Sequence, residues 1–427
     1  MKNESPFIVR WSRFSNGERM PFLVRASTGV PIDAPSFWTT AHRRALGVQP
    51  NTLFNELRSL MVFYLWADLR GIDIGERLQE GTFLELSEVI DLVNACGWSL
   101  DDLLSALHRR ASNVITPSGH MPTGGVKSGE KGNRLSVIRS FLEFTSSDHL
   151  SRLQAWPERW ALYRDMRDEC LSKLATHARG LRKRNRDDVG QREGLDPEVL
   201  VRLRAVIDPD HPDNPFERTV RFRNFVMIRL LIELGIRRGE LLGIMVGDCD
   251  VTGPRGYITI HRRPDNVLDR RIAPGASTKT AARKLELSPR TTQLVYEWIV
   301  HHRSKLPGAK KAEGQFLILS IPTGAAMSPS NVNKMFEVLR ERVPGLPGDV
   351  TPHVLRHSWN ETFSDYVDRN GISEQDEVKW RRRIMGWRDE ASAKFYLRRT
   401  VARRSNEVLR KMHNKLDISV KTEGQNP

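Results

Sequence analysis

The stretch GIRRGELL, residues 235–242, is the first of four segments that decide the fold of this chain. It follows residues 219–234, where apolar side chains recur at helical spacing and Val226, Leu230 and Leu234 are among the inward positions. The glycine interrupts that predicted helix, an arginine follows two residues later, and a glutamate lies one turn beyond the arginine. Alone, such a pair is typical of a helix-surface salt bridge worth about 0.2–0.5 kcal/mol.

Three further segments carry reactive side chains. STKTAARKLEL, which contains Lys279, leads into a predicted strand. TPHVLRHSW places His353 and Arg356 three residues apart, on one face of a helix. IMGWRDEASAKFYLRR separates Trp387 from Tyr396 by nine positions. Taken singly, each of these side chains has an ordinary structural explanation, as a surface charge, a helix-start residue or a core aromatic.

The residue types in these segments favour chemistry on a phosphate. Arginine forks match phosphate oxygens in a bidentate manner. A histidine three residues from an arginine can share that phosphate and transfer a proton. A tyrosine beside such a clamp is a candidate nucleophile, although its pKa near ~10 means that it needs a positive field or a base. The sequence shows no cluster with metal-ligand spacing.

In this order the four segments resemble the tyrosine recombinases, or phage-type integrases. That family has an arginine in a Gly-x-Arg-x-x-Glu-Leu setting, a lysine on a β-hairpin, a His-x-x-Arg box, and a Gly-His or Gly-Trp pair followed by a tyrosine. The matching residues here are Arg237, Glu240, Lys279, His353, Arg356, Trp387 and Tyr396. Residues 50–175 resemble the family's helical core-binding domain more loosely, through TLFNELRSLMVFYLWADLRGI.

The resemblance implies a role for each residue at the scissile phosphate. Arg237 and Arg356 would clamp the non-bridging oxygens in the pentavalent transition state. Tyr396 would attack phosphorus and leave a 3′-phosphotyrosyl link with a free 5′-hydroxyl, while Lys279 would protonate the departing 5′ oxygen. The reaction would need neither a metal ion, a cofactor nor ATP.

Three supporting roles follow from the same resemblance. His353 would transfer a proton on the nucleophile side, Glu240 would fix the arginine or the histidine, and Trp387 would hydrogen-bond the phosphate through its indole N–H. The commonest residue at the position of Trp387 is histidine. An indole N–H only donates a hydrogen bond, so base catalysis would fall to His353 or to water.

The hairpin lysine has an alternative. Besides Lys279, the predicted hairpin holds Lys284 and the arginines Arg270, Arg271 and Arg283. The TKT context favours Lys279, and Lys284 is the second candidate.

The expected architecture is mainly α, a two-domain DNA clamp with a helical core-binding domain and a mostly helical catalytic domain that has a small β-sheet. Its expected parts are a strand-bearing N-terminal arm (1–48), the core-binding domain (49–176), a basic linker (177–193), the catalytic domain (194–415) and a flexible tail (416–427). In the core-binding domain, helices are predicted at 53–65, 84–95, 100–109 and 135–144, with a glycine-rich loop at 117–133. In the catalytic domain, helices are predicted at 195–205, 219–234, 291–302, 330–342, 353–368 and 379–386, and strands at 257–261 and 284–287.

The linker HARGLRKRNRDDVGQRE, residues 177–193, has almost no apolar side chains. It is either a solvated connector or a basic strap along DNA phosphates. The two interpretations are compatible, because a connector can also contact the DNA backbone. The residues predicted to touch DNA are Arg179, Arg182, Lys183, Arg184 and Arg186. The basic run after Tyr396 likewise has two interpretations, a solvated helix or a terminal helix that docks on a neighbouring protomer.

The overall charge agrees with a nucleic-acid partner. The 427 residues contain 67 Lys and Arg against 52 Asp and Glu, which gives a net charge of +15 and a pI near 10.0. Such an excess suits a polyanion. The longest apolar run near the N-terminus, residues 60–67, is too short to span a bilayer, and no signal peptide is evident. Three widely spaced cysteines make a zinc site or a disulfide framework unexpected, so we expect a cytoplasmic protein.

The functional hypothesis is a site-specific DNA recombinase, or integrase, of a bacterial mobile element. It would act on double-stranded DNA as a tetramer, without a membrane partner. Two alternatives stay open: a monomeric DNA-relaxing topoisomerase with the same chemistry, and a catalytically silent DNA-binding protein with the same fold. The complete set of reactive residues speaks against the silent protein.

Overall fold

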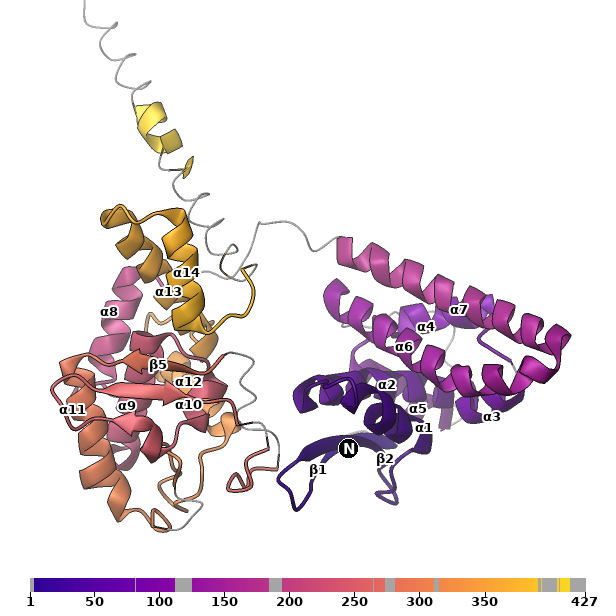
Figure 1. Cartoon of the computed structure of the whole chain (residues 1–427), viewed down its shortest axis with the longest axis horizontal. Helices are drawn as coiled ribbons and strands as arrows, with labels where there is room; N and C mark the ends of the chain where they lie inside the picture. The colour runs from indigo at the N-terminus through magenta and orange to yellow at the C-terminus, as the bar shows by residue number, and fades with distance from the viewer. Residues whose placement is uncertain are drawn as a thin grey trace, which may run out of the picture. The chain divides into compact units, whose positions relative to one another are not determined.

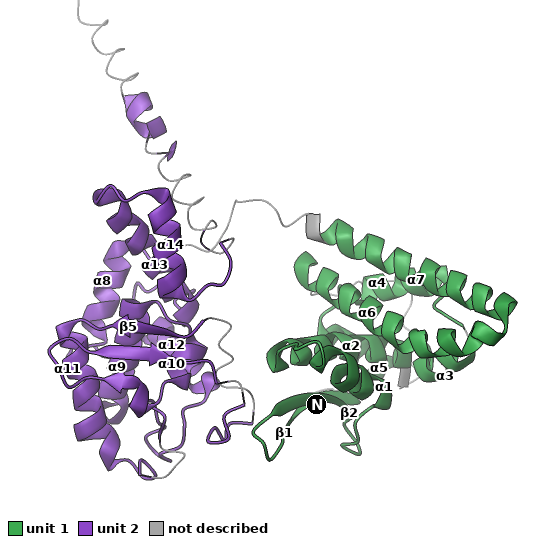
Figure 2. Cartoon of the chain, viewed as in Figure 1, with its two compact units in different colours: residues 1–190 green, residues 191–427 purple. Residues whose placement is uncertain are grey.

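The computed structural model describes residues 4–80, 82–111, 125–183, 194–263, 265–272, 281–310, 315–390, 393, 405–406 and 408–414. The chain divides into two compact units, Met1–Gly190 and Gln191–Pro427 (Figure 2). Each unit buries its own hydrophobic cluster. The prediction of a mainly α chain with two units and a small sheet in the second is confirmed. Within the described residues, no helix is both long and apolar enough to cross a bilayer.

Unit 1 begins with an antiparallel hairpin that packs on its central helix. Strands β1 (Phe7–Arg13) and β2 (Arg19–Arg25) pair from Phe7↔Arg25 to Arg13↔Arg19, and both contact α2 (Pro50–Arg70). The Phe7 ring meets Tyr64 edge-on with centroids 5.9 Å apart, and Trp11 stacks on Phe54 at 5.0 Å. Phe7 therefore belongs to the same core as the helices.

The remainder of unit 1 is helical. Its two longest helices, α6 and α7, lie side by side (Figure 1). The elements are α1 (Asp33–Phe37), the π-helix Trp38–Arg44, α2, α3 (Ile74–Glu80), α4 (Leu86–Ala95), α5 (Leu100–Ala111), α6 (Ser128–Arg152), the 3₁₀ turn Leu153–Ala155 and α7 (Pro157–Lys183).

Three features of unit 1 differ from the sequence-based expectation. The strand-bearing segment 1–48 is not a separate arm, because its apolar side chains complete the core under α2. Helix α6 begins at Ser128, inside the expected glycine-rich loop, of which residues 117–124 lie outside the described part. Helix α7 was not predicted, and it continues to Lys183, into the expected linker. Charged side chains on its exposed face obscure the periodic apolar pattern that would predict a helix. The helix forms nevertheless, because Leu, Lys and Arg are good helix formers.

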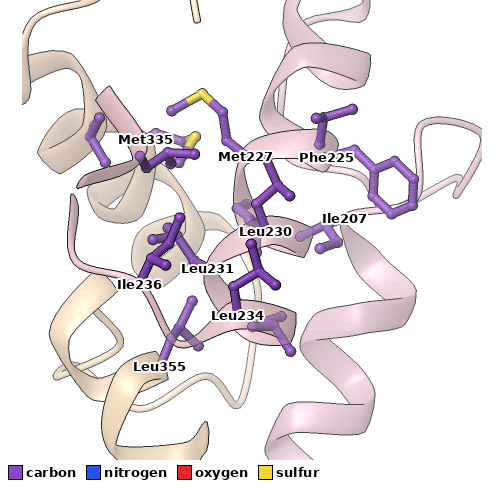
Figure 3. Packing of buried hydrophobic residues seen from close by; sticks show 14 of the residues in the cluster. Ile207, Phe225, Met227, Leu230, Leu231, Leu234, Ile236, Met335 and Leu355 are labelled. Carbon is purple, nitrogen blue, oxygen red and sulfur yellow. The ribbon is translucent and has the colours of Figure 1, made fainter. Parts of the chain in front are cut away.

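Unit 2 builds its core around α9 (Arg218–Leu234). Leu230, Leu231 and Leu234 of this helix are buried, and Figure 3 shows them packed with Ile207 and with Leu355 of α13. The helices are α8 (Pro197–Val206), α9, α10 (Arg238–Gly243), α11 (Pro289–Glu297), α12 (Pro329–Arg342), α13 (Pro352–Arg369) and α14 (Glu374–Met385), with short turns Val246–Asp248, Trp298–His302 and Arg303–Lys305.

The sheet of unit 2 is small and antiparallel. Among the described residues its strand order is β3 (Cys249–Asp250), β4 (Tyr257–Ile260) and β5 (Arg283–Glu286). Strands β4 and β5 pair from Tyr257↔Glu286 to Ile260↔Arg283. Along β5, Arg283 and Leu285 are buried whereas Lys284 and Glu286 are exposed. This alternation places Arg283 and Lys284 on opposite faces of the sheet.

Helix α14 is held on α13 by a buried arginine. Arg381 donates to the backbone oxygen of Asn360 at 2.9 Å, to Ser364 Oγ at 2.7 Å, and to the carboxylate of Glu377. Asn360 in turn donates from Nδ2 to the backbone oxygen of Arg356 at 2.8 Å. This network therefore connects α14 to the helix that carries the His-x-x-Arg box.

We expect Arg381→Gln to lower the free energy of unfolding of unit 2 by about 3–5 kcal/mol, because the change leaves the Glu377 carboxylate buried without its cation. Arg382→Gln is the matched control, since Arg382 pairs with the half-exposed Glu390 at 3.2 Å. An exposed pair contributes about 0–1 kcal/mol. Urea titration of both variants measures the difference, and equal midpoints would refute a structural role for Arg381.

Candidate active site

Arg237 occupies the turn between α9 and α10. Gly235 ends α9 with a left-handed backbone, φ 57°, and a Cβ atom there would lie 2.7 Å from Trp359 Cγ. The position therefore requires glycine. Arg237 is the N-cap of α10, and its backbone N–H donates to Glu240 Oε2 at 2.8 Å. Its side chain is 37% exposed, and Nη1 lies 3.9 Å from Glu240 Oε1.

Arg356 lies in the first turns of α13, whose N-cap Thr351 accepts a hydrogen bond from the Val354 backbone N–H. Arg356 is only 2% exposed. Nη1 donates to the backbone oxygen of Gly235 at 2.6 Å, and Nη2 to that of Met385 at 3.3 Å. One guanidinium thus joins the end of α9 to the end of α14.

Glu240 is the shared neighbour of both arginines. Arg356 Nη1 lies 3.9 Å from Glu240 Oε2, the same distance that separates Arg237 from the other oxygen. The carboxylate is 1% exposed and also accepts two hydrogen bonds from Arg283. The structure therefore gathers three guanidinium groups, from α10, α13 and β5, around one carboxylate.

His353 projects from the exposed side of α13. Its ring centroid is 4.5 Å from that of the buried His357, at an interplanar angle of 77°. The motif spacing places His353 and Arg356 on the same helix, but the histidine faces solvent while the arginine is buried. The contact with His357 had no signal in the sequence beyond the i, i+4 spacing.

Trp387 follows the end of α14. Gly386, with φ 69°, ends the helix, and the Trp387 backbone N–H donates to the Arg382 oxygen. The Arg356 guanidinium lies 5.5 Å from the centroid of the indole ring. The backbone N–H of Ala281 donates to the oxygen of Gly386 at 3.0 Å, so the residues just before β5 are bound next to this tryptophan.

Residues 195–403 match the model of the phage integrase family. Unit 2 therefore belongs to that family. This match confirms the resemblance to the tyrosine recombinases for the part of the chain that carries the four motifs.

Two solved structures have a similar fold. The Tn1549 transposon integrase in complex with a circular intermediate DNA is 16% identical, with a TM-score of 0.51, and the match covers 85% of this chain and 94% of that one. The same integrase in complex with transposon right end DNA is 17% identical, with a TM-score of 0.50, over 86% and 94% of the two chains. No curated protein matches the sequence.

Two residues of the expected catalytic set lie outside the described residues of the integrase unit. These are Lys279 and Tyr396. Of the predicted DNA contacts, Arg184 and Arg186 also lie outside, and only the backbone of Arg182 and Lys183 is described, at the end of α7. Arg179 lies on α7, where its Nε donates to the Ala175 oxygen at 3.4 Å. The roles of these residues stay predictions.

The second lysine candidate, Lys284, points away from the arginine cluster. Its ammonium nitrogen lies 4.2 Å from the centroid of the Tyr257 ring, on the face of the sheet opposite Arg283. Arg271 of the same hairpin is bound to Asp269 and to the Leu242 and Met327 oxygens. Lys279 lies outside the described residues, so the choice between the two lysines stays a prediction.

Other nucleophiles and ligand clusters are less suited to chemistry at this site. Burial and, to a smaller extent, the nearby Asp248 raise the pKa of the Cys249 thiol to about 12. A thiol of that pKa is protonated at neutral pH and is a poor nucleophile. Burial also lowers the pKa of Arg238, the neighbour of Arg237, from its usual value. In the described ranges, no group of three His, Cys, Asp or Glu side chains is arranged to hold a metal ion.

Proposed function

We propose that this chain cleaves and rejoins DNA at specific sites through a covalent 3′-phosphotyrosyl intermediate on Tyr396. One observation carries the proposal. Within an integrase-family unit, Arg237 and Arg356 come from separate elements and converge on the same buried carboxylate, each 3.9 Å from one of its oxygens. Two guanidinium groups held in this way form a clamp for one phosphodiester.

The clamp acts on charge that develops during attack. In the pentavalent transition state, negative charge grows on the non-bridging oxygens, and prearranged guanidinium groups stabilise it more than they stabilise the ground state. The Tyr396 oxygen forms a bond to phosphorus, and the bond from phosphorus to the 5′ oxygen breaks. Lys279 gives its proton to that oxygen, and the phenolic proton goes to His353 or to water.

The second half of the reaction reverses the first. A 5′-hydroxyl from the partner strand attacks phosphorus, the phosphotyrosyl bond breaks, and Tyr396 recovers its proton. Because the bond energy is kept in the protein–DNA link, the exchange needs no nucleotide and no metal. Trp387 donates an N–H to the phosphate and cannot accept a proton.

The substrate is double-stranded DNA, and the net charge of +15 favours its phosphates. The solved Tn1549 integrase structures are complexes with DNA, which supports the same partner here. Exchange between two duplexes requires four cleavages, so we propose that the protein acts as a tetramer on DNA. We further propose that a mobile genetic element carries its gene and that it acts in the cytoplasm.

A nicked suicide duplex tests the proposal. Once the target site is known from DNA flanking the gene, a nick close to the scissile phosphate lets the 5′-hydroxyl fragment diffuse away and traps the intermediate. We expect a protein–DNA band that resists denaturant and disappears after protease treatment. No band on the true site would support the silent DNA-binding alternative.

A second duplex in the same reaction separates the two enzymatic alternatives. Joined products from two differently labelled duplexes indicate a recombinase. Relaxation of supercoiled DNA without such products indicates the topoisomerase.

We expect DNA affinity to fall steeply with salt. A protein that neutralises six to ten phosphates loses about 10³–10⁵ in affinity between 50 and 200 mM salt. Fluorescence anisotropy over a salt series measures the slope, and Arg179→Gln should reduce its magnitude by about 1 if that side chain contacts a phosphate. Asp165→Asn, on the same helix, is a control that removes no cation. A flat salt dependence would contradict phosphate-dominated binding.

A further inference from the structure

We infer that Arg283 is a positioning residue of the phosphate clamp and acts through Glu240. The inference rests on the proposed function and extends it to a residue of the β-hairpin outside the four motifs' reactive set. It depends on how three arginines share one carboxylate.

The contact between Arg283 and Glu240 is a buried, bidentate ion pair. Nη1 donates to Oε1 at 3.0 Å and Nη2 donates to Oε2 at 3.1 Å, and the two side chains are 3% and 1% exposed. Paired guanidinium–carboxylate bonds of this kind fix both partners in orientation as well as in distance. Glu240 is therefore held by the Arg283 side chain of β5 and by the Arg237 backbone N–H, which donates to Oε2 at 2.8 Å.

The clamp arginines lie further from the same carboxylate. The guanidinium groups of Arg237 and Arg356 each approach it to 3.9 Å, beyond the length of a hydrogen bond. They are attracted by its charge, which offsets the repulsion between two guanidinium groups, at distances longer than those of the Arg283 bonds. Arg283 thus occupies the sites on Glu240 that would otherwise compete with DNA for the clamp.

Removal of Arg283 has a predictable geometric consequence. A buried carboxylate that loses its cation is strongly destabilised, and the nearest replacement cations are Arg237 and Arg356. Either one would have to shift toward Glu240 to form a direct ion pair. The shift takes N–H donors away from the phosphate, and the cluster also loses one of its positive charges.

A second contact makes Arg283 suited to this role. Its Nε donates to the backbone oxygen of Ile384 at 2.6 Å, near the end of α14. Met385, the next residue, accepts from Arg356. One side chain therefore sets the position of β5, of Glu240 and of the helix end that precedes Trp387.

The test measures single-turnover formation of the covalent adduct on the nicked duplex at saturating protein. We expect Arg283→Met to lower this rate about 10- to 100-fold, less than the 10²–10³ that loss of a direct oxyanion donor costs. DNA affinity should change by less than about threefold, because most phosphate contacts are intact. Arg283→Lys keeps the charge but not the bidentate geometry, so its rate should fall between those of Arg283→Met and the wild type.

The matched control is Arg255→Met. Arg255 pairs with Glu286 of the same hairpin at 2.9 Å, but both side chains are largely exposed. We expect its adduct rate to equal that of the wild type. A loss as large as in Arg283→Met would show that any ion pair of this hairpin matters, which overturns the assignment to Arg283.

A chemically altered substrate distinguishes positioning from general structural support. A methylphosphonate at the scissile position replaces one non-bridging oxygen by a methyl group, so less charge develops for the clamp to stabilise. We expect the rate defect of Arg283→Met to shrink at least threefold on this duplex. If the rate defect of Arg283→Met is equal on both substrates, the inference is overturned. It is also overturned if the rate of Arg283→Lys falls only in proportion to its loss of thermal stability.

The wild-type reaction distinguishes failure of the proposed function from failure of the role assigned to Arg283. Absence of a wild-type adduct counts against the proposed function. A wild-type adduct together with a normal rate in Arg283→Met refutes only the role of Arg283. The double variant Arg283→Met/Glu240→Met adds a further check: its defect should be smaller than the product of the two single defects, because both changes act through the same pair.

Discussion

Tyr396→Phe is expected to abolish the covalent protein–DNA adduct and to leave DNA binding unchanged. The substitution removes the phenolic oxygen that attacks phosphorus and keeps the aromatic ring. Loss of a covalent nucleophile lowers the rate by about 10⁴–10⁶-fold, which places the adduct below detection. Denaturing gels of the suicide-duplex reaction measure the adduct, and anisotropy measures binding.

The control for this change is another tyrosine of the same unit. Tyr366 lies on α13 with 59% of its surface exposed and outside the arginine cluster, so Tyr366→Phe should react like the wild type. If Tyr396→Phe still traps DNA covalently, the nucleophile is a different residue.

Arg356→Lys is expected to lower the cleavage rate by about 10²–10³-fold. Lysine keeps a positive charge, but a single ammonium cannot reproduce the fork that bonds to the Gly235 and Met385 oxygens. The amine therefore cannot hold its charge in the position that these two backbone oxygens fix for the guanidinium. Arg356→Ala should abolish cleavage altogether.

Binding decides how the Arg356 result is interpreted. One phosphate contact among many is lost, so the affinity should change little. Arg340→Lys serves as the control, because Arg340 also donates to a backbone oxygen, that of Val350 at 2.9 Å, away from Glu240. If binding falls as much as cleavage in Arg356→Lys, the residue supports folding rather than catalysis.

The sequence predicted the two clamp arginines and Glu240 but not Arg283, the residue that binds Glu240. Arg237, Glu240 and Arg356 lie in short motifs whose spacing reflects local helix geometry, and the structure brings all three together. Arg283 had no such signal as a partner of Glu240. Its contact depends on the register of β4 and β5 and on the approach of α10 to the sheet, neither of which a local pattern encodes.

The same contrast holds for the helices. The strongly apolar runs within α2 and α9 were predicted near their observed positions, because burial on most sides leaves a dense pattern. Helix α7 was missed because charged residues dominate its sequence and only its contact with α6 shows which side is inward. The lysine and the tyrosine of the active site stay predictions, since Lys279 and Tyr396 lie outside the described residues.

The hairpin at the start of the chain restricts how the protein can be shortened. Phe7 and Leu23 fill the core beside α2, and Trp11 covers Phe54. A recombinant fragment that starts at Pro50 would expose the apolar side chains on this side of α2 to solvent, and the fragment would be prone to self-association. Any minimal version of the first unit must therefore retain the first two strands.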